Sequence, residues 1–512
     1  MIAAPVRIML DRVTGRITMY RLVLLCLAVI LAAALVLSGL GILSYSVPEI
    51  LASWAVAVLA TVLSSLALAA AFRVRPHVES AIITGLLLLF LFRPTTDVAE
   101  LGAIALAGVI ASASKYLLAI RRRHIFNPAA IGALVVGLTQ LNFAAWWVAT
   151  PPLLPFTAIA AFVILYRTHR LAMGAGFIAL SAAIITTTLV ISGMDPLAAL
   201  GLAFTSYPIV FLAGFMLSEP LTLPPRRWQQ LALAGIVAVL LSSQFTLGPI
   251  YSSPELALVV GNAFAFAVGQ RRGIRLRFEG RTQLTPTSWE FEFAPQKRVS
   301  FAPGQYMEFT LPHKGADARG YRRVFSIASA PHPTSSGAVP PVRFGLRIPE
   351  KSSTFKRALL ALEPGALVSA TSVAGDFTLP RDVRKPLLFV AGGIGITPFI
   401  SQLEHLEREN ASRDLVIVYS SASGDELAYA DRLAAGGHRV LLVSPEPPEV
   451  LPMSWTYLGA GPLTGELLLR AVPDATGRDA FVSGAPQLVT ALRTALRSAG
   501  VRRVKTDYFS GY

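Results

Sequence analysis

The sequence predicts a polytopic α-helical membrane domain of about ten helices, followed by an antiparallel β-barrel and an α/β domain with a parallel sheet. Apolar runs near the ~20-residue length that crosses a bilayer fill the chain up to about residue 270. From Ile274 onward, apolar and polar residues alternate as in β-strands. A continuous apolar strand at 387–391 then leads into glycines. We therefore place the domains at 1–272, 273–383 and 384–512.

The first half contains ten apolar segments, and a cleaved leader would account for only one. Two of them, 78–92 and 152–166, are short for a full crossing, so we expect them to be tilted, broken or re-entrant. So many helices exceed what an anchor requires, which indicates a function within the lipid bilayer. The segments are 20–43, 50–71, 78–92, 98–120, 128–148, 152–166, 171–192, 196–216, 228–246 and 255–270.

The formal net charge of +15 does not indicate a nucleic-acid partner, because Lys and Arg are spread over both halves. In the first half the basic residues lie between apolar segments. If the N-terminus is cytoplasmic, the opposite side carries only Arg93. This asymmetry predicts a multi-pass protein of the cell (inner) membrane with both termini in the cytoplasm. The cytoplasmic side would carry Arg7, Arg12, Arg16, Arg73, Arg75, Arg121, Arg122, Arg123, Arg167, Arg170, Arg226, Arg227, Arg271 and Arg272.

The supply of cysteine and histidine limits the possible cofactors. The single cysteine, Cys26, excludes an intrachain disulfide, a structural zinc site and an iron–sulfur cluster with its usual four thiolates. The helical half has just His77, His124 and His169, whereas two stacked haems need four axial ligands. We therefore expect no haem, no iron–sulfur cluster and no metal site. A flavin is the simplest electron carrier that remains.

Three segments of the helical half carry distinctive polar residues. Residues 121–130 read Arg-Arg-Arg-His-Ile-Phe-Asn-Pro-Ala-Ala, 192–198 read Ser-Gly-Met-Asp-Pro-Leu-Ala, and 216–224 read Met-Leu-Ser-Glu-Pro-Leu-Thr-Leu-Pro. They resemble the membrane subunits Nqr B of the sodium-pumping NADH:quinone oxidoreductase and Rnf D of the Rnf complex, which implies a fold that handles flavin. The residues that the resemblance points to are Arg123, His124, Asn127, Ser192, Asp195, Glu219 and Thr222.

One position departs from that family. Where the family has a threonine that is esterified to FMN, this chain has Asp195. A carboxylate cannot form that phosphoester, and its charge repels the phosphate. We therefore expect a noncovalent membrane flavin, FMN or riboflavin, or a site remodelled for another role.

Plainer explanations compete for the same residues. Asn127 followed by Pro128 is also a common way to begin a helix. Arg121–Arg123 are also the kind of charge cluster that fixes topology. Asp195 and Glu219 lie near expected membrane boundaries, where solvated loop positions are common. Each of these alternatives stays open on the sequence alone.

In the second half, alternation at 275–279, 289–293 and 305–311 predicts consecutive barrel strands. The stretch Arg323-Val324-Phe325-Ser326 then follows Gly304-Gln-Tyr306 and precedes Lys351-Ser-Ser-Thr-Phe-Lys356. This pattern over 274–512 resembles the ferredoxin–NADP reductase superfamily. The resemblance implies that Arg323-Val324-Phe325-Ser326 binds FAD, with Arg323 on the flavin phosphate, Phe325 against the isoalloxazine and Ser326 near flavin N5. It also assigns Ser353 and Thr354 to the pyrophosphate.

A glycine-rich turn, 392–398, stands between the apolar strand and an amphipathic helix. Gly392, Gly393 and Gly395 would let a pyrophosphate approach the backbone, Thr397 could cap the helix, and Pro398 fits its first turn. A purely structural turn is the alternative.

Two further segments complete the expected site. The resemblance places 482–486 near the nicotinamide, with Ser483 in place of the usual cysteine, beside Gly484 and Pro486. It also suggests that Phe509 or Tyr512 covers the flavin. The residues that we expect closest to the chemistry are thus Ser326, Ser483, Phe509 and Tyr512.

The choice between NADH and NADPH depends on the residues after strand 415–419. The run Ser420-Ser-Ala-Ser-Gly-Asp-Glu426 lacks the arginine that often binds a 2′-phosphate, which favours NADH. Arg432 or Arg439 could still supply that charge.

Together these features predict a membrane-bound flavin oxidoreductase. Electrons would pass from cytosolic NAD(P)H through FAD to a flavin, a quinone or an extracytoplasmic acceptor in or across the membrane. A redox-driven sodium or proton pump component is the alternative. A non-enzymatic flavin carrier or redox sensor is the third possibility. The sequence leaves the terminal acceptor, the ion coupling and the oligomeric state open.

Overall fold

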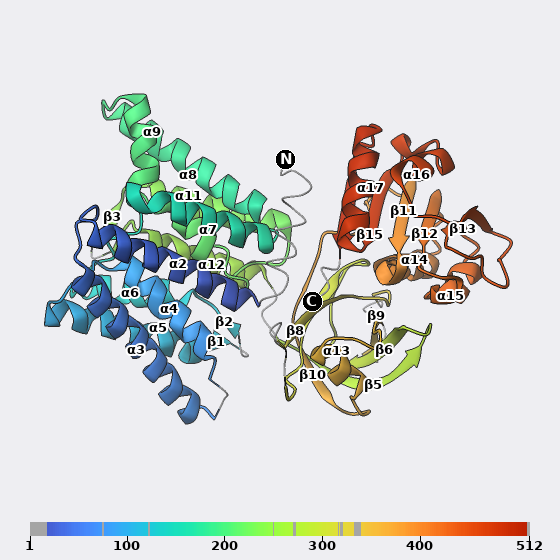
Figure 1. The fold of residues 1–512 in the computed structure, drawn as a ribbon, viewed down its shortest axis with the longest axis horizontal. Coiled ribbons are helices and arrows are strands. Elements are labelled where there is room, and N and C mark those ends of the chain that lie inside the picture. Colours follow the sequence, from blue (N-terminus) through green and yellow to red (C-terminus); the bar gives the residue numbers. More distant parts are fainter. Residues whose placement is uncertain are drawn as a thin grey trace. The chain divides into compact units, whose positions relative to one another are not determined.

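The computed structural model describes residues 18–73, 76–120, 123–248, 250–269, 273–315, 317, 321–331 and 339–508. The chain divides into two compact units, Met1–Arg272 and Gly273–Tyr512 (Figure 1). The first is helical and the second contains two six-stranded sheets. Each unit is described by itself.

The helical unit has a helix in every one of the ten expected apolar segments. Two short hairpins, β1/β2 and β3/β4, connect some of these helices. The elements are α2 (Met19–Gly39), α3 (Val47–Ala71), α4 (Val78–Leu91), α5 (Val98–Leu117), β1 (Ala119–Ile120), β2 (Arg123–His124), α6 (Pro128–Leu138), η1 (Pro151–Leu153), α7 (Leu154–Arg167), α8 (Leu171–Ile191), α9 (Pro196–Thr205), α10 (Ile209–Phe211), η2 (Leu212–Met216), α11 (Arg227–Ser242), β3 (Thr246–Leu247), β4 (Ile250–Tyr251) and α12 (Pro254–Val268).

Fewer than ten of the described helices are long enough to be candidates for a full membrane crossing. Within the described residues, four helices are long and apolar enough to span a bilayer, namely α2, α3, α5 and α8. A fifth is formed if α9 and 209–216, which bend by 51° at their break, count as one span. The other apolar helices are shorter, as expected for 78–92 and 152–166. The unit is therefore a multi-pass helical domain with four or five candidate spans.

The expected end of the apolar segment 128–148 is wrong for its helix, because α6 already ends at Leu138. Gln140 and Trp146 have positive φ angles of 60° and 50°, a left-handed backbone conformation that a continuing α-helix excludes. The connection turns back across the core, and Trp146 and Trp147 are 4% and 3% exposed. Aromatic side chains therefore fill this part of the bundle.

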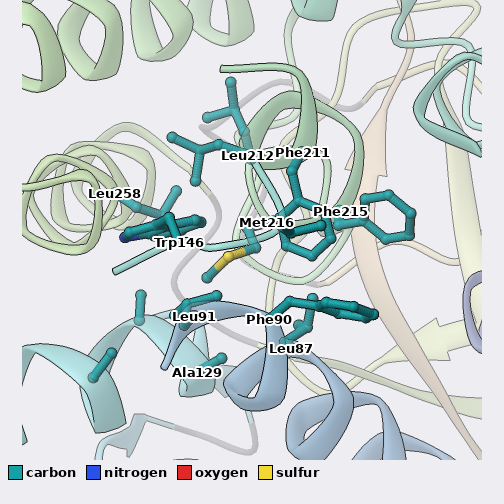
Figure 2. Packing of buried hydrophobic residues seen from close by; sticks show 14 of the residues in the cluster. Leu87, Phe90, Leu91, Ala129, Trp146, Phe211, Leu212, Phe215, Met216 and Leu258 are labelled. Atoms are coloured by element: carbon teal, nitrogen blue, oxygen red, sulfur yellow. The ribbon is translucent and has the colours of Figure 1, made fainter. Parts of the chain in front are cut away.

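The core of the helical unit gathers around α4 and the broken helix 209–216. Figure 2 shows Met216 amid Trp146, Leu91 and Phe215. Small residues let other helices approach closely: a Cβ on Gly132 would lie 2.4 Å from the Ala107 carbonyl oxygen. Close backbone approach through small residues is the usual basis of helix association in lipid.

The second unit begins with an antiparallel sheet in the order β8-β7-β10-β5-β6-β9. A single bridge between Ile327 and Phe344 joins its two edges, so the sheet curls into a barrel. Phenylalanines 278, 291, 293, 309 and 344 fill the interior. The elements are β5 (Ile274–Gln283), β6 (Ser288–Pro295), β7 (Tyr306–Thr310), β8 (Arg322–Ser326), β9 (Val342–Arg347), α13 (Thr354–Leu360) and β10 (Leu367–Ala374).

The remaining strands form a parallel sheet in the order β14-β13-β12-β11-β15-β16. Its central strands are continuous apolar runs because helices cover the sheet. The proposed boundary at 383/384 falls in the connection between β10 and β11. The elements are β11 (Leu387–Gly392), η3 (Gly393–Ile396), α14 (Thr397–Arg408), β12 (Leu415–Ser420), η4 (Gly424–Glu426), α15 (Ala430–Ala435), β13 (Arg439–Val443), β14 (Trp455–Gly459), α16 (Gly465–Ala471), η5 (Ala475–Gly477), β15 (Asp479–Gly484), α17 (Pro486–Ser498) and β16 (Val504–Tyr508).

Candidate functional site

Strand β8 places the first motif at one edge of the antiparallel sheet. Arg323 and Phe325 are 3% and 8% exposed, whereas Val324 between them is 37% exposed. The alternation expected of a strand therefore holds for these three residues. Ser326 breaks it, since it is also buried, at 2% exposure. Its burial follows from a contact with the parallel sheet of the same unit.

Ser326 donates a hydrogen bond from Oγ to Asp507 Oδ2, across 3.1 Å. Asp507 lies on β16, in register with Ser483 on β15. Ser483 is fully buried, and its hydroxyl has no hydrogen-bond partner among the described residues. Two of the serines expected near the chemistry are thus grouped around one carboxyl that sequence reasoning missed.

The Asp507 carboxyl has an altered acidity. Burial raises the pKa of Asp507 from 3.8 to about 6, and the hydrogen bond from Ser326 opposes this shift. A carboxyl with a pKa near 6 can hold or release a proton close to neutral pH. The only signal for it in the sequence is an acidic residue just before the terminal segment 508–512, which is weak.

The guanidinium of Arg323 lies over the ring of Phe355, 5.1 Å from its centroid. Arg323 Nη2 is 3.5 Å from Asp317 Oδ1. The other oxygen of that carboxylate accepts a 3.4 Å hydrogen bond from the backbone N–H of Thr354, at the start of α13. Asp317 therefore brings negative charge to the two groups that we expect to bind phosphate.

Ser353 and Thr354 both lie at the start of α13, as expected for phosphate contacts. In this structure, however, their side chains make local hydrogen bonds. Ser353 caps the helix by accepting from Lys356 N at 3.4 Å. Thr354 Oγ1 accepts from Asp317 N at 3.0 Å and lies 2.9 Å from His313 Nε2. Phosphate binding by these hydroxyls would require them to exchange partners.

The glycine turn lies between β11 and α14, as predicted. Gly393 has a φ of +54°, and a Cβ on Gly395 would lie 2.6 Å from the Ser483 carbonyl oxygen. A Cβ on Gly484, whose φ is +150°, would lie 3.1 Å from the Gly392 carbonyl oxygen. Gly395 and Gly484 therefore let the ends of β11 and β15 meet, whereas Gly393 has open space where a Cβ would lie.

Two helix-start predictions have different outcomes. Pro398 lies in the first turn of α14, as predicted. Pro486, for which no helix start is predicted from the sequence, lies in the first turn of α17. Thr397 does not cap α14, which corrects the prediction: it is already helical, and its Oγ1 donates to the Ile394 carbonyl at 2.7 Å. The preceding 3₁₀ turn instead supplies the hydrogen-bond acceptors for the backbone N–H groups at the start of α14.

The two arginines considered for a 2′-phosphate differ in their surroundings. Arg432 is bound to Glu404 at 2.9 Å and to Glu290 at 3.3 Å, so its guanidinium is already engaged. Arg439 is the first residue of β13 and is exposed. After β12, Ser421 Oγ donates to the Glu426 carbonyl at 2.9 Å.

In the helical unit, four residues of the predicted set come together. His124 Nε2 lies 3.0 Å from Glu219 Oε1, and Asn127 Nδ2 donates to Glu219 Oε2 at 2.9 Å. Thr222 Oγ1 donates to the Glu219 carbonyl at 3.3 Å. Asn262 on α12, which sequence reasoning missed, accepts from Asn127 N at 2.8 Å. We call His124, Asn127, Glu219 and Asn262 the polar cluster.

Ser192 and Asp195 are not part of the polar cluster. Asp195 caps α9 and accepts hydrogen bonds from Leu197 N at 3.0 Å and from Ala198 N at 2.9 Å. Ser192 Oγ donates to the Thr188 carbonyl at 2.9 Å. The α8–α9 corner lies at the end of the helical unit away from β2 (Figure 1). Any cofactor contact of Ser192 or Asp195 would therefore belong to a separate site, and it stays a prediction.

Some predicted residues cannot be placed. Phe509 and Tyr512 lie outside the described residues, as does the side chain of Arg123. Among the residues that the structure describes, no group of three or more His, Cys, Asp or Glu side chains could hold a metal ion.

No family model matches the chain. Among curated proteins, it is 34% identical over 146 residues to ferredoxin–NADP reductase B of Sorangium cellulosum, which covers 28% of this chain and 56% of that one. It is 27% identical over 188 residues to an NADPH oxidoreductase of Mycobacterium tuberculosis, covering 36% and 44%. The chain thus spans about half the length of the curated relatives it matches.

Among solved structures, a ferredoxin–NADP+ reductase from Neisseria gonorrhoeae with bound FAD and NADP aligns at 18% identity with a TM-score of 0.39. The alignment covers 47% of this chain and 98% of that one. The C-terminal part of the chain is similar in sequence to ferredoxin–NADP reductases and NADPH oxidoreductases, and it is joined to a helical unit with four or five candidate membrane spans.

Proposed function

We propose that the chain is a membrane-bound oxidoreductase that passes electrons from cytosolic NADH or NADPH, through FAD, to a flavin or quinone in the membrane or to an acceptor across it. The observation that carries this proposal is the contact of Ser326 with Asp507, which lies in register with Ser483. It joins the strand expected to hold flavin to β16, which pairs with the strand expected to hold nicotinamide.

The residues present fit an FAD molecule. Arg323 would bind its phosphate, Phe325 would pack on its ring system, and Ser353 and Thr354 would meet its pyrophosphate at the start of α13. When bound, flavin supplies hydride acceptance and one-electron release. Ser326 would direct its hydroxyl proton to flavin N5. The protonation state of Asp507 would decide whether that proton is free to do so or is donated to the carboxylate.

For the nicotinamide cofactor, the glycine turn at 392–395, where Gly393 has open space beside it, would accept the pyrophosphate, and 482–486 would lie near the ring. Pro486 starts the adjoining helix and fixes its direction. NADH is the preferred donor in this proposal because Glu404 and Glu290 already engage Arg432. A 2′-phosphate would then have little positive charge to meet after β12.

The polar cluster is the proposed acceptor site of the helical unit. Asn127, His124 and Asn262 offer the donors and acceptors that the ring edge of a flavin or a quinone headgroup requires. Their placement is consistent with the resemblance to Nqr B and Rnf D. At the separate α8–α9 corner, Asp195 cannot carry FMN as a phosphoester, so a flavin there would be noncovalent.

A redox-driven pump is the second candidate, and one observation favours it. Glu255 on α12 is 2% exposed, and its Oε2 accepts a hydrogen bond from Trp146 Nε1 at 3.1 Å. Ionisable groups inside a helical bundle often bind the transported ion. Proton or sodium uptake by proteoliposomes during NADH oxidation would favour this candidate over simple electron transfer.

A flavin inventory of the purified full-length protein tests the main proposal. FAD should be released by acid, together with FMN or riboflavin if the membrane site holds a flavin. NADH should then bleach the bound flavin faster than NADPH does. Protein with flavin but without any NAD(P)H oxidation would instead favour the carrier or sensor alternative, and protein lacking flavin or showing haem bands would contradict the proposal.

A further inference from the structure

Helix α14 touches both halves of the proposed hydride-transfer site. Its first residue, Thr397, follows the glycine turn. One turn later, the buried Ser401 Oγ donates to the Ser329 carbonyl at 2.7 Å, and Glu404 Oε2 accepts from Ala330 N at 3.1 Å. Ser329 and Ala330 follow closely after Ser326. One helix is thus bonded to the extension of the flavin strand and begins at the nucleotide turn.

The segment 327–330 is also held from its other side. Ala328 N donates to the Arg343 carbonyl on β9 at 2.7 Å, and Arg343 N donates to Ser329 Oγ at 3.2 Å. The segment therefore lies between β9 and α14, with hydrogen bonds to each. A shift of α14 would move this segment, and the segment is continuous with the strand that carries Ser326.

A charge network reinforces the contact. Glu404 Oε1 accepts from Arg343 Nη2 and from Arg432 Nη1, while both guanidiniums also approach Glu290 Oε1, at 3.7 and 3.3 Å. The Glu404 and Glu290 side chains are 17% and 11% exposed. In such partly buried surroundings, charged hydrogen bonds are directional, and removing one partner leaves the others poorly compensated. The network therefore resists sliding of α14 against the barrel.

We propose that Ser401 and Glu404 are positioning residues that set the distance over which hydride passes from nicotinamide to flavin. The inference rests on the proposed function. In that step the nicotinamide loses one hydride with its electron pair and the flavin gains it, so no other reactant is required. The rate of such a transfer is sensitive to displacements of about 1 Å, whereas the contacts proposed for FAD and NADH themselves are made by other residues.

The test compares four variants of the full-length protein with wild type. Ser401→Ala removes one hydrogen-bond donor, and Glu404→Gln keeps the shape of the side chain but removes its charge. Glu407→Gln is the matched control on the same helix, because the Glu407 side chain is 53% exposed and only approaches His438, at 3.9 Å. Glu404→Asp keeps the charge and serves as a milder variant should Glu404→Gln fail to fold.

Two measurements are made on each variant: anaerobic single-turnover reduction of FAD with protiated and deuterated NADH, and amide hydrogen exchange of 327–331. We expect Ser401→Ala and Glu404→Gln to slow reduction at saturating NADH about 10- to 100-fold. Their FAD content and NADH affinity should stay unchanged, and their kinetic isotope effect should become more temperature-dependent. Exchange of the Ala330 amide should accelerate, while Glu407→Gln should match wild type.

Wild-type reduction rates in both variants, or a loss confined to NADH affinity, would overturn the inference while leaving the proposed function intact. Unchanged exchange at 327–331 would also overturn it. A wild-type protein that neither NADH nor NADPH reduces would overturn the proposed function, and the inference with it.

Discussion

Ser326 and Asp507 are joined by a 3.1 Å hydrogen bond although they are 181 positions apart in the chain. The contact links the barrel to the last strand of the parallel sheet. It places a hydroxyl and a proton-binding carboxyl together, where the flavin N5 atom is proposed to lie. The proposed chemistry and part of the pH dependence of stability therefore depend on the same pair.

Replacing Asp507 by asparagine should make stability less dependent on pH. Below about pH 3 the carboxyl is protonated in both the folded and the unfolded chain. As the pH rises toward the raised pKa of about 6, the unfolded chain releases its proton first, so the folded state loses stability. The full loss above that pH is at most about 3 kcal/mol.

Asp507→Asn should therefore raise the apparent melting temperature at pH 7.5 and have little effect at pH 4. Thermal unfolding of the variant across this range checks the prediction. The exposed Asp425→Asn variant is the control and should follow wild type. An increase in the melting temperature of Asp507→Asn at pH 4 equal to the increase at pH 7.5 would contradict the raised pKa of Asp507.

Replacing Arg323 by lysine should weaken FAD binding about 10- to 100-fold, because an ammonium lacks the two-pronged guanidinium geometry. Equilibrium dialysis of FAD against flavin-stripped protein measures the change. The neighbouring Arg322→Lys, whose charge is not assigned to the phosphate, should bind FAD as wild type does. Equal affinity in Arg323→Lys and wild type would remove Arg323 from the phosphate site.

Replacing Asp317 by asparagine should strengthen FAD binding up to about fivefold, because a carboxylate that competes with phosphate for Arg323 and the start of α13 is neutralised. The same dialysis should show that the gain shrinks as salt is added. Weaker binding in Asp317→Asn would mean that the carboxylate helps to hold the flavin rather than competing with it.

Replacing Glu219 by glutamine should slow electron transfer to the membrane acceptor while leaving reduction of FAD by NADH unchanged. Glu219 holds His124 and Asn127 in place, at 3.0 and 2.9 Å. Separate measurement of flavin reduction and flavin reoxidation distinguishes the two steps. The exposed Glu100→Gln is the control, and a defect in the reduction step alone would exclude this role for the polar cluster.

Local patterns predicted most of the elements, because apolar periodicity and turn residues act over short distances. The ten apolar segments each contain a helix, and the strands begun at Ile274 and Leu387 appear where the alternation and the apolar run indicate. The early end of α6 was missed because left-handed residues at Gln140 and Trp146 leave no signal in hydrophobicity.

Contacts between distant residues were harder to predict. His124, Asn127 and Glu219 were named from their segments, but Asn262 lies 135 positions from its partner and is flanked by apolar residues. Asp507 was missed for the same reason. Thr397 is expected to cap α14, but the preceding 3₁₀ turn already supplies acceptors for the backbone N–H groups at the start of that helix. In each case the deciding interaction is tertiary, and the local sequence carries little trace of it.

The most direct test of the account is anaerobic mixing of NADH with the full-length protein in lipid nanodiscs, first without and then with a quinone. The account predicts that NADH reduces the bound FAD, that quinone reoxidises it, and that Glu219→Gln blocks only the second phase. Flavin that NADH leaves oxidised, or quinone reduction that proceeds equally well in Glu219→Gln, would contradict the proposed route from the cytosolic unit into the membrane.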